Sequence, residues 1–111
     1  MNIQYKKGIL ELCVLSLLVK RDFYGYELVE SISKSIEISE GTIYPLLRRL
    51  SDAKLVETYL QESTVGPPRK YYRLTQKGKN SQQQQYQQWQ HFSSTINKFL
   101  KETIDEQKRI S

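Results

Sequence analysis

The apolar positions in the first half of the chain predict three helices. Residues 4–20 carry apolar side chains so densely that a helix there must be covered on more than one side. A second amphipathic segment spans about 25–34 and, after a short break, a third spans about 40–53. Ser39 stands where an N-cap belongs, and Glu40 in the first turn complements the helix dipole.

The second half predicts a hairpin and one long helix. Residues 55–60 and 69–74 are rich in strand formers, and the segment 63–68 between them, which ends in Gly-Pro-Pro, predicts the connecting loop and a protruding tip. A final helix is expected from Thr75 to about Lys108.

Residues 82–90 within that helix are mostly glutamine, a composition that also occurs in disordered segments. Tyr86 and Trp89 interrupt the glutamines at helical spacing, which favours the helix. The order is typical of a mainly α fold with a small β-hairpin. We expect a winged helix-turn-helix domain over residues 1–74 and a long C-terminal dimerisation helix over residues 75–111.

The third helix separates an apolar stripe from a face suited to reading DNA. At 100° per residue its apolar positions share one side, namely Ile43, Leu46, Leu47 and Leu50. The other side presents Gly41, Tyr44, Pro45 and Arg48, with Thr42 on its flank. This face fits a recognition helix in the major groove of DNA, but periodicity alone fits an exposed helix without a partner equally well.

The distribution of charge favours DNA. The net charge is +5, and residues 61–80 alone hold five basic residues and one acidic residue. Arg69 and Lys70 directly follow Pro68, which predicts a wing that contacts minor-groove phosphates. A solvated pair of charges is the alternative, and the preceding helical pattern makes the wing the better interpretation.

Composition excludes several other functions. Cys13 is the one cysteine and His91 the one histidine, so no internal disulfide and no Cys/His metal cluster can form. The glycines form no phosphate-binding loop, and the apolar run at 9–19 is too short to cross a bilayer. We therefore expect a cytoplasmic protein that is not an enzyme, needs no cofactor and has no membrane partner.

Three segments resemble the PadR family of bacterial transcription regulators: GYEL at 25–28, EGTIYPLLRRL at 40–50 and GPPRKYYRLT at 66–75. The resemblance covers roughly residues 6–80. Ala53 and Lys54 depart from the family pattern, since Lys54 replaces a glycine at the end of the third helix.

The resemblance implies a homodimeric repressor that binds a pseudo-palindromic operator in double-stranded DNA and that an effector can release. The DNA-binding residues that pattern and resemblance together indicate are Ser39, Gly41, Thr42, Tyr44, Pro45, Arg48, Pro68, Arg69 and Lys70.

The final helix predicts how a dimer would form. At 1.5 Å per residue it would be about 50 Å long and would overhang its own domain. Its apolar positions recur at steps of three and four, as in a coiled-coil seam. The expected interface consists of Leu10, Val14, Trp89, Phe92, Ile96, Phe99, Leu100 and Ile104.

Trp89 has two interpretations. It could line a pocket for a small aromatic effector at the dimer centre, or it could be a plain interface anchor. For the whole chain, the alternative function is a winged-helix protein-interaction module that dimerises without binding specific DNA.

Overall fold

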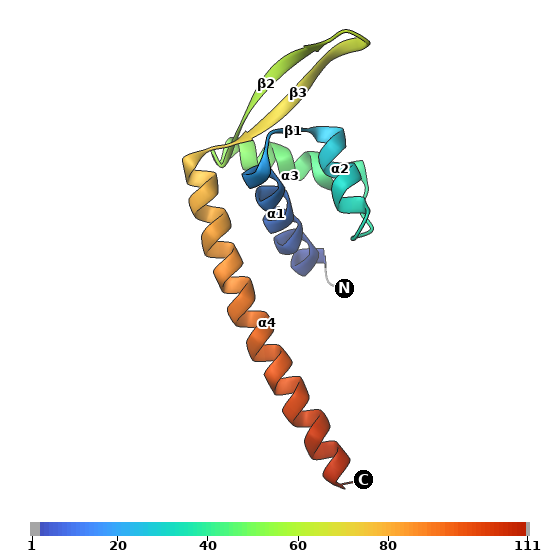
Figure 1. The fold of residues 1–111 in the computed structure, drawn as a ribbon, viewed down its shortest axis with the longest axis vertical. Coiled ribbons are helices and arrows are strands. Elements are labelled where there is room, and N and C mark those ends of the chain that lie inside the picture. Colours follow the sequence, from blue (N-terminus) through green and yellow to red (C-terminus); the bar gives the residue numbers. More distant parts are fainter. Residues whose placement is uncertain (1–2, 111) are drawn as a thin grey trace.

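A head of three helices and a small sheet carries one long helix that extends away from it (Figure 1). The computed structural model describes the backbone of residues 3–110 and the side chains of residues 8–109. In this part of the chain the elements are α1 (Ile3–Lys20), β1 (Phe23–Tyr24), α2 (Gly25–Ser33), α3 (Glu40–Asp52), β2 (Val56–Ser63), β3 (Gly66–Leu74) and α4 (Gln76–Ile110). The expected mainly α winged helix-turn-helix with a long C-terminal helix is confirmed.

The core of the head forms where the apolar sides of α1, α2 and α3 meet the inner face of the sheet. The stripe predicted for α3 is buried as expected, with Ile43 and Leu47 fully enclosed and Leu46 and Leu50 nearly so. The other largest fully buried side chains are Leu10, Val14, Leu15 and Leu28. This packing fixes α3 to the head and leaves its opposite side in solvent.

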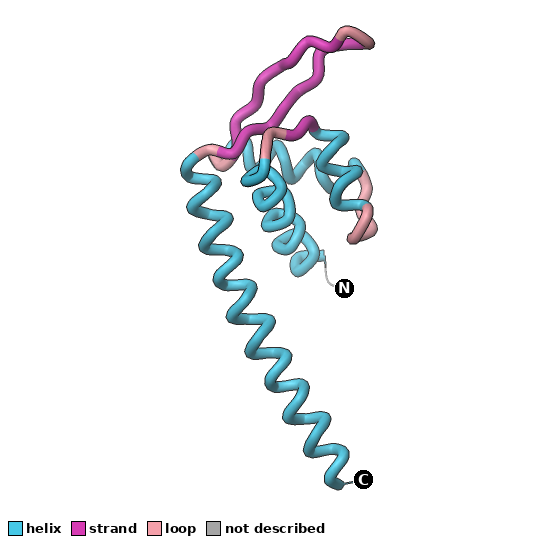
Figure 2. The backbone as a smooth tube through the Cα atoms, viewed as in Figure 1, coloured by secondary structure: helices cyan, strands magenta, loops and turns pink. Residues whose placement is uncertain are grey.

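The sheet has three antiparallel strands in the order β1-β3-β2 (Figure 2). The short strand β1 was not predicted, because two residues are too few to show an alternating pattern. It pairs through Phe23 with Tyr72 and through Tyr24 with Tyr71. The sheet thereby ties the start of α2 to the hairpin.

The hairpin loop lies within the predicted segment 63–68 but is shorter than predicted, because both strands extend into that segment. The turn lies at Thr64–Val65, and the Gly-Pro-Pro segment begins strand β3. The pairing of β2 with β3 is irregular between Gln61 and Ser63, opposite Pro67 and Pro68. Prolines are tolerated at such an irregularity because they have no N–H to contribute to the ladder.

The end of α3 is closed by a residue in the left-handed region. Lys54 has φ 64°, and the N–H of Leu55 donates to the carbonyl of Leu50 at 3.0 Å, as in a Schellman motif. Lys54 thus occupies the conformation that the family's glycine would adopt without strain.

The beginning of α4 is bound tightly to this turn. The hydroxyl of Thr75 donates to the carbonyl oxygen of Lys54 at 2.7 Å, and it accepts the N–H of Gly78 at 3.0 Å. Thr75 therefore caps α4, as predicted. A Cβ on Gly78 would fall on the carbonyl oxygen of Leu55, so the helix can approach the turn this closely only with glycine.

Helix α4 continues without a break through the glutamine-rich segment 82–90, so the helical interpretation is confirmed. It lies beside α1, where Gln82 donates to the hydroxyl of Ser16 at 3.1 Å, and then leaves the head (Figure 1). The described chain measures 66 × 27 × 21 Å. Within residues 3–110, no helix combines the length and the apolar character needed to cross a membrane.

Candidate nucleic-acid interface

Helix α3 presents its polar side to solvent, as the pattern predicted. Gly41, Tyr44, Pro45 and Arg48 are all exposed, whereas Thr42 is half-buried. The helix continues through Pro45. The head therefore exposes one face of a single helix, and the major groove of DNA is wide enough to admit one helix.

Ser39 precedes α3 in an extended conformation and occupies the N-cap position, as predicted. Its carbonyl accepts the N–H groups of Thr42 and Ile43 at 3.1 and 3.3 Å. The Ser39 hydroxyl makes no cap hydrogen bond to the backbone and instead lies 3.4 Å from the hydroxyl of Thr42. Two hydroxyls are thus paired at the exposed start of the helix.

The ring of Tyr44 leans towards α2 rather than straight into solvent. A Cβ built on Gly25 would lie 2.7 Å from Cε1 of Tyr44, so the ring uses the space that a side chain at residue 25 would fill. Partial burial, followed by the charge of Glu40, raises the pKa of Tyr44 above its ordinary value. The hydroxyl is therefore protonated at neutral pH and can donate a hydrogen bond.

The wing cations lie along strand β3 and not at the hairpin tip, which corrects the predicted geometry. Arg69 pairs with Gln61 and Lys70 with Leu60, several residues from the turn. Alternation along the strand sends the two side chains to opposite faces of β3, and both still reach the cleft between α3 and the wing. Arg69 lies over the ring of Tyr24, 4.7 Å from its centroid, and Lys70 approaches the ring of Tyr72 at 5.8 Å.

A cleft of about 480 Å³ separates α3 from the wing. Its lining combines aromatic rings, three cations and one carboxylate, so it is net positive. The lining residues are Tyr24, Gly25, Tyr26, Tyr44, Leu47, Arg48, Ser51, Asp52, Arg69, Lys70 and Tyr72. Burial raises the pKa of Tyr72 as well, so this hydroxyl is also protonated at neutral pH. The cleft can accept an anion and donate hydrogen bonds to it.

Tyr24 and Tyr72 belong to this cleft, although sequence analysis did not select them. The two-residue strand that places Tyr24 could not be predicted. Side chains two residues apart in a strand lie on the same face, so the sequence could have placed Tyr72 beside Lys70.

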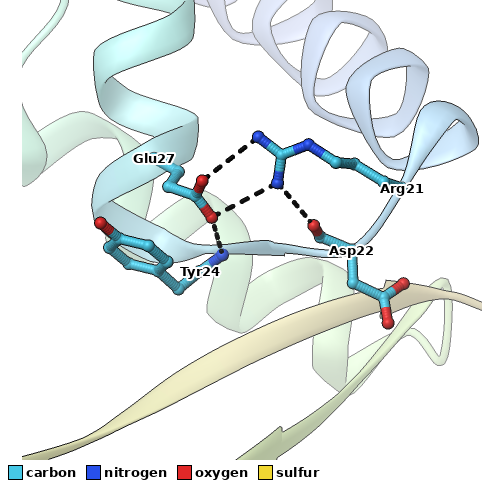
Figure 3. A network of polar contacts seen from close by, with 4 residues as sticks. All are labelled: Arg21, Asp22, Tyr24 and Glu27. Carbon is cyan, nitrogen blue, oxygen red and sulfur yellow. Dashed lines mark hydrogen bonds and ion pairs between the residues drawn. The ribbon is translucent and has the colours of Figure 1, made fainter. Parts of the chain in front are cut away.

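A network of polar contacts fixes Tyr24 at the edge of the cleft (Figure 3). The backbone N–H of Tyr24 donates to Glu27 at 3.1 Å, and Arg21 forms an ion pair with the same carboxylate at 3.2 Å. Arg21 also donates to the backbone carbonyl of Asp22 at 2.9 Å. These contacts join the end of α1, strand β1 and the first turn of α2.

The side chain of Asp22 extends in the other direction, to the hairpin. It accepts a hydrogen bond from the hydroxyl of Tyr59 at 2.7 Å and lies 3.4 Å from Nε of Arg73. Tyr59 in turn stacks on Tyr71, with ring centroids 5.5 Å apart. The hydrogen bond to Asp22 is the main reason that the pKa of Tyr59 is raised. The wing is thereby held to the head along its outer face.

Helix α4 exposes the apolar residues predicted for a dimer interface. Six of them form what we call the α4 seam, and each is at least 38% exposed: Trp89, Phe92, Ile96, Phe99, Leu100 and Ile104. Leu10 and Val14 do not belong to this surface, because both are 0% exposed in the core of their own chain. Periodicity could not separate them from the outer positions of α1, since α1 is apolar around most of its circumference.

Trp89 borders a groove of about 460 Å³ between α1 and α4. Its lining comprises Gly8, Ile9, Glu11, Leu12, Gln85, Gln88, Trp89 and Phe92. Among the side chains that the structure describes, no group of three or more His, Cys, Asp or Glu is placed to hold a metal ion.

Comparison with known proteins decides the family. Residues 14–84 match the transcriptional regulator PadR-like family. The chain belongs to this family. The members regulate transcription and are not enzymes, so the PadR-like chain is a DNA-binding regulator, in agreement with the interface described above.

Two solved structures of PadR regulators resemble the chain, and so does one curated relative. A PadR-like transcriptional regulator from Bacillus cereus is 42% identical, with 87% of this chain and 96% of that chain covered and a TM-score of 0.80. A PadR family regulator from Eggerthella lenta is 34% identical, with coverages of 88% and 87% and a TM-score of 0.78. An uncharacterized protein from Lysinibacillus sphaericus is 33% identical over 98 residues, which are 85% of this chain and 90% of the relative.

Proposed function

We propose that the protein is a cytoplasmic repressor that binds a pseudo-palindromic operator as a homodimer. In this proposal residues 1–74 form the DNA-binding head and residues 75–111 the dimerisation helix. The observation that carries the proposal is the net positive cleft between the exposed face of α3 and the wing.

The two walls of the cleft would have different roles in binding DNA. Tyr44 and Arg48 on α3 would reach base edges in the major groove, where hydrogen bonds and apolar contacts distinguish sequences. Arg69 and Lys70 would contact phosphates, which contribute affinity regardless of sequence. The proposed DNA-binding residues are Ser39, Gly41, Thr42, Tyr44, Pro45, Arg48, Pro68, Arg69 and Lys70.

A salt series with duplex DNA tests this division. We expect Arg69→Ala and Lys70→Ala each to reduce the slope of log affinity against log salt by about one. Tyr44→Ala should weaken binding to a selected duplex more than binding to random duplex. Lys101→Ala is the matched control, because Lys101 is an exposed cation on α4, outside the cleft. Affinity that depends neither on salt nor on the wing substitutions would contradict the proposal and favour a protein-interaction module.

The homodimer rests on the α4 seam. Phe99 is 62% exposed and Phe92 50% exposed on a helix that overhangs the head, and a second copy would bury both. Light scattering should show that Phe99→Glu yields monomers whereas the neighbouring Lys98→Glu leaves the dimer intact. A dimer that survives Phe99→Glu would place the interface elsewhere.

The groove beside Trp89 is the proposed site for a small aromatic effector. Its walls combine the large aromatic ring of Trp89 with apolar side chains of α1, so proflavine, a flat aromatic molecule, is a suitable probe. Calorimetry should detect proflavine binding to the protein and its loss in Trp89→Leu. Binding that Trp89→Leu leaves unchanged would assign Trp89 to the interface alone.

A further inference from the structure

One carboxylate on α1 is bonded to two other helices. Glu11 forms an ion pair with Arg49 of α3, with 3.1 Å between Oε1 and Nη1. The other oxygen of Glu11, Oε2, accepts a hydrogen bond from Nε2 of Gln85 of α4 at 2.9 Å. Glu11 is thus the common bonding partner of Arg49 and Gln85.

The geometry leaves this carboxylate little freedom. The Glu11 side chain is 19% exposed, and an enclosed carboxylate that loses a partner is destabilised by desolvation. Gln85 is itself held on α4, because its Nε2 also donates to the hydroxyl of Ser81 at 2.9 Å. Each oxygen of Glu11 therefore has a fixed partner on a different helix.

The same three residues connect two functional surfaces. Glu11 and Gln85 line the groove between α1 and α4, beside Trp89. Arg49 follows Arg48 in α3, on the edge of the face that reads DNA. A displacement of α4 along this groove would therefore act on a carboxylate that is also paired with Arg49 of α3.

We propose that Glu11 is a positioning residue that fixes α3 relative to α4 and so sets the half-site spacing that the dimer accepts. The inference rests on the proposed dimeric binding of DNA, because spacing has meaning only when two heads are joined through α4. It assigns to Glu11 no contact with DNA.

The test measures affinity as a function of spacing. A duplex selected by the wild-type protein from random sequences is compared with versions whose centre is lengthened by one, two or three base pairs. The proteins are wild type, Glu11→Gln and Gln85→Leu, with exposed Glu30→Gln and Gln84→Leu as matched controls. Gln85→Leu removes the α4 end of the link and leaves the ion pair with Arg49 intact, so it serves even if Glu11→Gln fails to fold.

We expect wild type and both controls to prefer one spacing sharply. Glu11→Gln and Gln85→Leu should each reduce that preference by about threefold or more, the size of effect that one such contact produces. A residue that only stabilises the head would lower the melting temperature and leave the spacing preference unchanged, and that result would overturn the inference. A wild-type protein without any spacing preference would overturn the dimeric mode of binding itself and the inference with it.

Discussion

Gly25 and Tyr44 are in contact across the interface between α2 and α3. A Cβ on residue 25 would lie 2.7 Å from Cε1 of Tyr44, closer than real Cβ atoms approach other atoms, and 3.1 Å from its hydroxyl oxygen. Tyr44 is 39% exposed, so its ring rests on α2 without being locked inside the core. The absence of a side chain at residue 25 therefore determines the direction of a side chain on the exposed face of α3.

Gly25→Ala should displace Tyr44 at little cost to folding, because the ring can rotate into solvent. We expect the melting temperature to change by only a few degrees and the affinity for the selected duplex to fall by about tenfold, equivalent to about 1.4 kcal/mol. Fluorescence anisotropy with selected and random duplexes measures both affinities, and the loss should be confined to the selected one.

The matched test is a double-mutant cycle. In a Tyr44→Ala background, Gly25→Ala should have no further effect on affinity, because the group that it displaces is gone. Equal losses in both backgrounds would mean that residue 25 acts on DNA binding by another route.

Gly78→Ala should destabilise the protein, because the added Cβ would meet the backbone carbonyl of Leu55, which cannot move aside. We expect a loss of about 2–3 kcal/mol in the free energy of unfolding, measured by urea denaturation. Gly8→Ala in α1 is the control, since a Cβ there meets no described atom within 4 Å. It should stabilise the helix by about 0.5–1 kcal/mol. Similar effects of the two substitutions would show that helix propensity, and not the close approach of α4 to Leu55, determines the effect of Gly78→Ala on stability.

Lys54→Gly should stabilise the protein. Lys54 has φ 64°, a left-handed conformation that strains any residue with a Cβ by about 1 kcal/mol or more. Glycine removes the strain but adds flexibility to the unfolded chain, so we expect a net gain of about 0.5 kcal/mol. Lys54→Ala keeps a Cβ and removes the charge. An equal gain from Lys54→Ala would trace the effect to charge instead of backbone strain.

Stability should fall at high pH because tyrosines in the head resist ionisation. Burial raises the pKa of Tyr72 above its ordinary value of 10.0, so near that pH the folded state holds a proton that the unfolded state has lost. The free energy of unfolding is then unaffected by Tyr72 below about pH 10 and decreases as pH rises further. Urea denaturation from pH 8 to pH 11 should show a shallower decrease in Tyr72→Phe. The exposed Tyr26→Phe serves as control, and a slope equal to wild type in Tyr72→Phe would contradict this prediction.

The sequence was sufficient to predict the elements that carry strong periodic patterns. The stripe of α3 from Ile43 to Leu50 identified both the buried and the exposed side of the helix, because a helix with one apolar side has only one way to pack. The spacing of Phe92, Ile96 and Phe99 in the same way marked an apolar side of α4, which is exposed in the structure. These features depend on local spacing alone.

The remaining features depend on contacts between distant residues. Strand β1 exists only because Phe23 and Tyr24 meet the hairpin. The loop was predicted too long because a Gly-Pro-Pro run usually marks a loop, whereas here the prolines belong to β3 and lie where the ladder is irregular. Leu10 and Val14 were misassigned because α1 is apolar on nearly every side. In each case the outcome depended on which distant segments of the chain pack against one another.

The single tryptophan of the chain makes one region of the molecule separately observable. Trp89 belongs to α4 and lines the groove between α1 and α4, together with Glu11. Intrinsic fluorescence excited near 295 nm therefore originates from this place alone. Its emission wavelength and lifetime are a native signal for subunit exchange or ligand entry, with no label and no substitution required.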